Sequence, residues 1–367
     1  MAKKLKIGYV TTSLSSIDGW GRYSKSLVEA VAPKAEVVVL TTAQTVNESE
    51  PNIFVKEVLP EPGFHPVVQL KVFWNAVKYF RGCDVVHSLV ECYSPGLALA
   101  SYLLGSKLIM TLHGTYSVPP AKLSIKKILM LIAYRRVSIA TTGSKYTEQK
   151  VREIVNFGEC RFIPNGVDDK IFYLLSETKN ENYLITVGAL KSRKGADLVI
   201  RAMTSLLTQF PNLKYKIIGA SDDESYIKLL YDLIEQNQLS TRVELLGRVS
   251  DSDLRLLYNQ ASVFILAARD VSGNFEGFPM VFYEANACGI PVITTSGFGS
   301  EYAIKSGHNG LVIPPDRPEE IAKAVKQIIT DPKIYQAYRN ASLIEASNHT
   351  WSKIADQILE MYNDAIK

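Results

Sequence analysis

The chain has 367 residues, of which 47% are hydrophobic and 21% charged, and a formal net charge of +4. This is the composition of a globular protein and excludes a disordered chain, while no apolar stretch approaches the roughly 20 residues that span a bilayer. The chain exceeds the size of a single hydrophobic core, so two domains of about 170 residues are the natural division.

The first half alternates short apolar runs with stretches of helical pattern. It opens with a strand at residues 5–10, followed by a polar loop to Tyr23 and a helix that begins near Ser24. Further strands are expected at residues 37–40, 85–87, 107–112 and, as the last of this half, 137–142. Alternation of this kind predicts a mostly parallel, doubly wound sheet.

The second half repeats the pattern. Strands are expected at residues 183–187, 215–218, 243–245, 263–266 and 292–294, with helices between them. The turn-rich stretch at residues 162–168 is where we place the boundary between the halves, and a last helix is expected at about residues 352–366. The predicted fold class is therefore α/β, with two Rossmann-like, doubly wound parallel-sheet domains.

Charge and cysteines bear on where the protein works. Residues 1–170 contain 21 Lys and Arg against 14 Asp and Glu, whereas residues 171–367 contain 20 against 23. A basic first half suits an anionic acceptor or a membrane surface, and equally an ordinary solvated face.

The four cysteines form no C-x-x-C pair, and the start Met-Ala-Lys-Lys-Leu-Lys resembles no signal peptide. We therefore expect buried free thiols and a cytoplasmic location.

The segment Glu-Gly-Phe-Pro-Met-Val-Phe-Tyr-Glu, from Glu276 to Glu284, is the most informative part of the chain. Gly277 and Pro279 predict a turn into a helix that starts at the proline, and Gly289 predicts its end. Eight helical residues advance about 12 Å, so the two carboxylates cannot share one proton or one small metal ion. The N–H groups of the helix start between them favour a phosphate. The segment thus suits a sugar nucleotide; the alternative is two surface glutamates on an ordinary helix.

This segment resembles the E-x7-E motif of the retaining glycosyltransferases of family 4, which have the GT-B fold. The resemblance implies that Glu276 lies beside the donor sugar and that Glu284 holds the ribose hydroxyls. It also implies donor contacts from Gly277, Phe278 and Pro279, and a C-terminal helix that crosses back onto the first domain. Other stretches along most of the chain are similar to this family as well.

The loop after the first strand contains Gly19, Gly21 and Arg22. Glycines let a backbone approach a ligand closely, and the helix start that follows favours an anion. Ser24 stands where the third glycine of a G-x-G-x-x-G fingerprint would be, so a dinucleotide site is poorly supported. In the resembled family this loop contacts the donor phosphate or the acceptor. The alternative is a flexible surface turn.

His113 follows the strand expected at residues 107–112. In open parallel sheets, ligands bind beyond the carboxyl ends of the strands. In the resembled family the matching histidine lies against the donor sugar, whereas a lone histidine is otherwise more often structural. His87 and Glu91 follow another strand and are expected at most to shape the acceptor side.

A second glycine-containing loop, Gly-Ala-Leu-Lys-Ser-Arg-Lys-Gly at residues 188–195, follows the first strand of the second half. Arg193 and Lys194 lie before a glycine and a helix, an arrangement that suits a diphosphate. The loop resembles the family's phosphate loop, with Lys194 as its phosphate lysine. The family's usual arginine is replaced by Ala189, so either Arg193 compensates or Lys194 acts alone. The alternative is a solvated basic loop.

Two further stretches concern the base and a metal. The resemblance implies that Arg248 and Val249 form the wall for the nucleotide base, which backbone groups read. Asp251 and Asp253 form a D-x-D pair, which holds a metal in a different glycosyltransferase fold. Here the pair opens a helix, where an aspartate cap is expected, and no other Asp, Glu and His cluster has ligand spacing. We therefore expect no metal and no cofactor.

Residues 122–136 mix lysines and arginines with isoleucines and leucines. A basic amphipathic helix can lie on an anionic membrane. A helix packed on the core with a solvated basic face explains the same pattern, so both interpretations stay open.

Taken with these features, the family resemblance implies a retaining, metal-independent hexosyltransferase. It would use a nucleotide-diphospho-sugar, with UDP-glucose favoured over GDP-mannose, and a hydroxyl of a glycan or lipid-linked acceptor. Residues 1–165 would form the acceptor-side domain, residues 166–350 the donor domain and residues 351–367 the returning helix, with Glu276, His113 and Lys194 as catalytic residues. Peripheral membrane contact stays open as one of the two interpretations of residues 122–136, and a nucleic-acid partner is not expected. A nucleotide-sugar epimerase of the same fold and a non-catalytic nucleotide-sugar-binding subunit are the alternatives.

Overall fold

The computed structural model describes residues 4–42, 52–178, 180–220 and 223–367. The chain divides into two compact units. One consists of Met1–Asn165 together with Trp351–Lys367, and the other of Gly166–Thr350.

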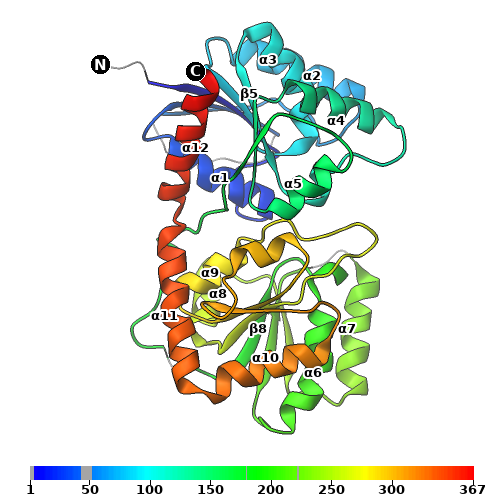
Figure 1. Ribbon diagram of the computed structural model, residues 1–367, viewed down its shortest axis with the longest axis vertical. Helices are drawn as coiled ribbons and strands as arrows, with labels where there is room; N and C mark the ends of the chain where they lie inside the picture. The colour runs from blue at the N-terminus through cyan, green and yellow to red at the C-terminus, as the bar shows by residue number, and fades with distance from the viewer. Residues whose placement is uncertain (1–3, 43–51, 179, 221–222) are drawn as a thin grey trace. The chain divides into compact units, whose positions relative to one another are not determined.

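The first unit is built on a parallel sheet of seven described strands in the order β3-β2-β1-β4-β5-β6-β7 (Figure 1). The strands are β1 (Lys6–Val10), β2 (Glu36–Thr41), β3 (Ile53–Glu57), β4 (Val85–Ser88), β5 (Lys107–Leu112), β6 (Ile139–Thr142) and β7 (Glu159–Phe162). The sequence analysis missed β3 and β7 and took β6 as the last strand, which is wrong. Both missed strands are edges with partly exposed side chains, so neither has the continuous apolar run of a central strand.

Helices cover both faces of this sheet. They are α1 (Gly19–Val31), α2 (Pro66–Tyr79), α3 (Ser94–Leu104), α4 (Ile125–Arg136), α5 (Lys145–Arg152) and α12 (Trp351–Ile366). α1 packs against α12, whereas α3 contacts both α2 and α4 (Figure 1). The polar loop expected up to Tyr23 is wrong, because Asp18 caps α1 by accepting a hydrogen bond from the Gly21 N–H at 2.9 Å.

The second unit has a parallel sheet of six described strands in the order β10-β9-β8-β11-β12-β13. The strands are β8 (Tyr183–Val187), β9 (Lys214–Ile218), β10 (Val243–Gly247), β11 (Val263–Leu266), β12 (Val292–Thr295) and β13 (Gly310–Ile313). The sequence analysis missed β13. A Cβ atom at position 310 would lie 1.9 Å from the Val292 carbonyl oxygen, so this edge strand must open with Gly310. Strand propensity disfavours glycine, which is why the strand was missed.

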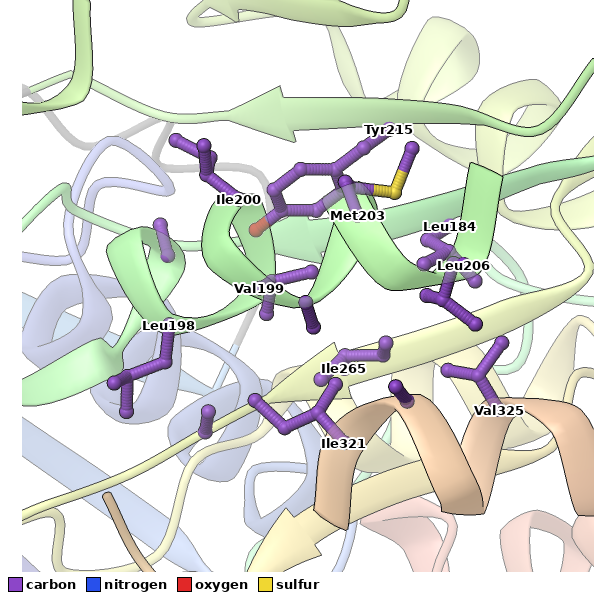
Figure 2. Packing of buried hydrophobic residues seen from close by; sticks show 14 of the residues in the cluster. Leu184, Leu198, Val199, Ile200, Met203, Leu206, Tyr215, Ile265, Ile321 and Val325 are labelled. Atoms are coloured by element: carbon purple, nitrogen blue, oxygen red, sulfur yellow. The ribbon is translucent and has the colours of Figure 1, made fainter. Parts of the chain in front are cut away.

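Six helices of the described chain flank this sheet: α6 (Ala196–Leu207), α7 (Glu224–Gln236), α8 (Asp251–Gln260), α9 (Val281–Ala287), α10 (Pro318–Thr330) and α11 (Pro332–Asn348). Figure 2 shows part of the core around α6, where Met203 lies beside the ring of Tyr215 of β9 and Val199 points toward Ile265 of β11. On the other face, the ring of Phe264 packs edge-on against Phe282 of α9 at 5.3 Å. The sheet is therefore buried on both faces, as its apolar strands predicted.

All four cysteines are free: Cys83, Cys92 and Cys288 are buried and Cys160 is half-buried. Burial raises the pKa of the Cys83 and Cys160 thiols to about 12, so both stay protonated and unreactive at neutral pH. Among the described helices, none combines the length and the apolar character needed to cross a membrane.

Candidate functional site

The second unit has a topological switch point between β8 and β11. From β8 the chain proceeds to β9 and β10 at one side of the sheet, then returns to β11 on the other side of β8. Ligands of doubly wound folds bind at the carboxyl ends of strands at such a point. The loop after β8 carries the short 3-10 turn η3 (Ser192–Lys194), and the segment after β11 leads to Glu276.

Glu276 brings these two loops together. Its carboxylate is 6% exposed, with Oε1 lying 2.8 Å from Arg193 Nε and Oε2 lying 3.7 Å from Lys194 Nζ. The Arg193 contact is an ion pair without hydrogen-bond geometry, so Oε1 has no hydrogen-bond donor among the described residues. A buried carboxylate oxygen of this kind is suited to accept a hydrogen bond from a ligand hydroxyl.

Lys194 is the more enclosed of the two cations. Its side chain is 13% exposed, against 25% for Arg193. Burial lowers the pKa of the Lys194 ammonium, while Glu276 opposes that shift. The enclosed ammonium of Lys194 is poorly hydrated. Although it lies beside a carboxylate, it therefore forms a strong binding site for an anionic group of a ligand.

Close packing of glycines shapes the loop around Lys194. A Cβ atom on Gly188 would lie 2.7 Å from Lys194 Nζ, and one on Gly195 would lie 2.1 Å from the Ala267 carbonyl oxygen. Both glycines have positive φ values, +137° and +70°. Only glycine satisfies both conditions, so these two positions fix the path of the lysine side chain across the ends of β8 and β11.

Arg269, which the sequence analysis missed, holds η3 in place. Its Nε donates to the Ser192 carbonyl at 2.8 Å and its Nη2 donates to Asp197 Oδ1 at 2.8 Å. Tyr226 donates to the same Asp197 oxygen at 2.9 Å, and the Arg269 N–H donates to the Arg193 carbonyl at 3.0 Å. Its position shortly after β11 was the signal in the sequence that could have identified Arg269 as part of the site. The network ties the loop after β11 to the basic turn after β8.

Glu284 lies on α9, which begins at Val281 and not at Pro279 as expected. Proline two residues before the helix instead belongs to a buried turn, with Phe278 packed 5.7 Å from the Tyr283 ring. Glu284 is therefore one turn inside the helix, and its Oε2 accepts a hydrogen bond from Tyr258 at 3.2 Å. Gly277 and Pro279 are buried in the same turn, between the two glutamates.

The residues after β10 occupy the edge of the sheet. Arg248 is exposed and Val249 half-buried, and their backbone is tied to the centre where the Gly219 N–H donates to the Gly247 carbonyl. Ser250, and not an aspartate, caps α8, because its Oγ accepts from the Asp253 N–H at 3.1 Å. Asp251 and Asp253 lie in the first turn, and no group of three metal-ligating side chains occurs within the described ranges.

In the first unit, His113 follows β5 and is oriented by Glu91. The Glu91 Oε1 accepts from the His113 N–H at 2.8 Å and from Ser117 Oγ at 2.5 Å. The His113 ring donates from Nε2 to the Leu89 carbonyl at 2.7 Å and packs edge-on against Tyr23 at 4.6 Å. Glu91 Oε2 is buried without a hydrogen-bond partner in the part of the chain described, so this carboxylate organises the turn after β5.

His87 is structural. It is fully buried, with Nδ1 2.6 Å from the Tyr362 hydroxyl and Nε2 2.8 Å from Thr111 Oγ1. Burial lowers its pKa to about 3, so the ring stays neutral and fastens α12 to the sheet. The expectation that His87 shapes an acceptor site is therefore wrong.

Gly19, Gly21 and Arg22 lie in the first turn of α1. Gly19 is exposed, whereas a Cβ atom on Gly21 would lie 2.3 Å from the Ser15 carbonyl oxygen. Arg22 donates to the Ser16 carbonyl at 3.3 Å. Packing alone accounts for Gly21, and the donor contact expected for this turn stays a prediction.

Two doubly wound parallel sheets, with a charged loop at the switch point of the second, define the GT-B class of fold. The family model described as Glycosyltransferase Family 4 matches residues 17–170, and the model described as Glycosyl transferases group 1 matches residues 168–343. The two matches follow one another along almost the whole chain. The chain belongs to the family 4-like glycosyltransferases with the GT-B fold.

Individual relatives agree with this assignment. The chain is 26% identical over 289 residues to an uncharacterised glycosyltransferase of Methanocaldococcus jannaschii, covering 77% of this chain and 76% of that protein. It is 25% identical over 338 residues to D-inositol 3-phosphate glycosyltransferase 1 of Catenulispora acidiphila, covering 86% and 76%. The solved structure of Anabaena HepE in complex with UDP and glucose superposes with a TM-score of 0.81 at 19% identity, covering 98% of this chain and 100% of that one.

Proposed function

We propose that this glycosyltransferase moves a hexose, with retention, from a nucleotide-diphospho-sugar to a hydroxyl of a glycan or lipid-linked acceptor. The observation that carries the proposal is the buried carboxylate of Glu276 beside Arg193 and Lys194 at the switch point. A sugar diphosphate presents a hydroxyl-rich ring next to two negative charges, which matches a carboxylate next to two cations.

In this mechanism Arg193 and Lys194 stabilise the departing diphosphate, together with the amides of the turn at residues 276–278. Glu276 accepts hydrogen bonds from the sugar, and Glu284 holds the ribose. The acceptor hydroxyl attacks on the face from which the diphosphate leaves, which preserves the anomeric configuration without a carboxylate nucleophile. His113 keeps the sugar contact that the family resemblance implies, with Glu91 as its positioning residue.

UDP-glucose is the donor that we favour, with GDP-mannose second. The complex of Anabaena HepE with UDP and glucose supports this choice. A donor of this kind is made inside cells, so the proposal includes a cytoplasmic location. Ala189 leaves the phosphate loop without the usual arginine, and Arg193 takes the place of that charge.

Nucleotide release tests the proposal. The protein is incubated with UDP-glucose or GDP-mannose, with and without acceptor extracts, and the anomeric configuration of any product is read by NMR. The expected result is acceptor-dependent release of one nucleotide, an α-linked product and full activity in EDTA. Release with a changed free sugar and no acceptor identifies an epimerase, binding without release identifies a non-catalytic subunit, and loss on chelation that Mn²⁺ restores overturns the metal-free mechanism.

A further inference from the structure

The outer side of α2, α3 and α4 is apolar where a solvated helix layer should be polar. The inner sides of these helices already bury Val72, Leu97 and Met130 in the core of the first unit. The outer side nevertheless exposes further large side chains, from 48% to 81% of their area in α2 and at the start of α4: Val67, Leu70, Trp74, Leu123, Ile125 and Ile128. α3, which packs between the two, exposes Leu99, Tyr102 and Leu103.

α3 contacts both α2 and α4 (Figure 1), so these exposed side chains lie on three adjoining helices. Val67, Leu70 and Trp74 are spaced i, i+3, i+7, which places them on one face of α2. Single exposed apolar residues are ordinary, but a contiguous set on adjoining helices marks a surface that something covers. We call this set, with its lysines, the α2–α4 surface.

The charge of the α2–α4 surface has one sign. α2, α3 and α4 contain no Asp or Glu, and residues 62–147 contain 10 Lys and Arg against two acids, Asp84 and Glu91. Neither acid neutralises the surface, because Glu91 is 2% exposed and Asp84 accepts a hydrogen bond from the Lys6 N–H. Lys71, Lys78 and Lys122 are exposed beside the apolar side chains. A covering partner must therefore be apolar and anionic at once.

We propose that the α2–α4 surface lies on the anionic face of a lipid bilayer. Leucine, isoleucine and tryptophan side chains enter the headgroup region, while lysines reach the lipid phosphates, which is how interfacial helices bind. α2 has 14 residues and α4 has 12, so each lies on the membrane and does not cross it. The surface is independent of the proposed donor site, because it belongs wholly to the first unit and contains none of the donor residues.

Sedimentation with vesicles tests this proposal on the whole chain. We compare vesicles of phosphatidylcholine with vesicles in which part of it is replaced by phosphatidylglycerol. The expected result is salt-sensitive binding to the anionic vesicles only. Lys71→Gln with Lys122→Gln should lower the partition coefficient about fivefold per lysine, and Leu123→Ser with Ile128→Ser should lower it at least tenfold.

A control variant places one lysine change and one apolar change on α11. Lys333→Gln with Ile344→Ser, both exposed in the second unit, should bind vesicles as the parent chain does. Circular dichroism confirms that each variant is folded, and turnover of a water-soluble acceptor should be unchanged in all three. That last readout separates this proposal from the proposed function, since either can fail while the other holds.

Three results overturn the proposal. The first is absence of binding to anionic vesicles, and the second is equal binding by all variants. The third is loss of binding in the lysine variant alone, which shows an electrostatic contact without insertion of the apolar side chains. Sedimentation velocity covers a different occupant: a dimer of the parent chain that Leu123→Ser with Ile128→Ser dissociates would assign the surface to a second copy.

Discussion

Arg193 Nε lies 2.8 Å from Glu276 Oε1, although the two residues are 83 positions apart in the chain. The cation that we propose for the diphosphate is thus held against the carboxylate that we propose for the sugar. Because the two side chains form an ion pair, a substitution that removes one charge also leaves the other side chain without its partner. Substitutions at this site must therefore keep side-chain shape where they test charge, and each needs a neighbouring control.

Lys194→Ala should weaken binding of UDP-glucose far more than binding of uridine. A charge-assisted contact to a phosphate in this enclosed setting contributes about 1.5–3 kcal/mol, or roughly 10- to 150-fold in affinity. Calorimetric titration of both ligands measures the difference. Lys191→Ala removes an exposed lysine of the same loop and should change neither affinity appreciably. Small, equal effects of Lys194→Ala on both ligands would show that Lys194 does not contact the diphosphate.

Raising the pH should weaken UDP-glucose binding before an ordinary lysine loses its proton. Burial lowers the pKa of Lys194, so its positive charge is lost at a lower pH than the usual value of 10.5. Lys194→Arg keeps a charge that does not titrate, so its affinity should stay flatter over the same alkaline range. The ratio of the two dissociation constants against pH is the measurement. Parallel curves for the two proteins would exclude Lys194 as the titrating group.

The central strands and the loops proposed to bind the donor could be predicted from the sequence. The side-chain contacts that join these loops could not. β5, β8 and β11 were predicted to the residue, because each is a short buried apolar run between turn signals. β3, β7 and β13 were missed because edge strands lack that pattern. The bond from Arg269 to Asp197 joins residues 72 positions apart, and no local pattern encodes a tertiary contact of that length.

Arg269→Lys should loosen η3 and raise the KM for the donor. Arginine reaches the Ser192 carbonyl and the Asp197 carboxylate at once, whereas lysine cannot reproduce this two-pronged geometry. Loss of one charge-assisted hydrogen bond corresponds to about 1.5–3 kcal/mol of unfolding free energy. Thermal unfolding and steady-state kinetics measure both effects. Arg201→Lys, at an exposed position on α6, is the control, and identical behaviour of the two variants would refute the role of Arg269.

Because His87 is buried in its neutral form, the free energy of unfolding should decrease as the pH falls below about 6.5. Its folded pKa is about 3, below the value of about 6.5 in the unfolded chain, so only the unfolded chain takes up a proton in this range. Its contribution to stability is present above pH 6.5 and is lost toward pH 3, by up to about 1.4 kcal/mol per pH unit. Urea unfolding of His87→Gln should show a shallower slope. A slope for His87→Gln equal to that of the parent chain would exclude His87 as the group responsible.

Substitutions of Glu276 and Glu284 should change different kinetic parameters. Glu284→Ala should mainly raise the KM, because a carboxylate that holds ribose hydroxyls acts alike in the ground state and the transition state. Tyr258→Phe should give a weaker form of the same effect, since Tyr258 donates to Glu284 at 3.2 Å. Glu276→Gln should instead lower kcat with little change in UDP affinity, because glutamine keeps the shape and removes the charge beside the reacting sugar. If Glu276→Gln and Glu284→Ala weaken nucleotide binding equally and spare turnover, the assignment of sugar and ribose to these two carboxylates is wrong.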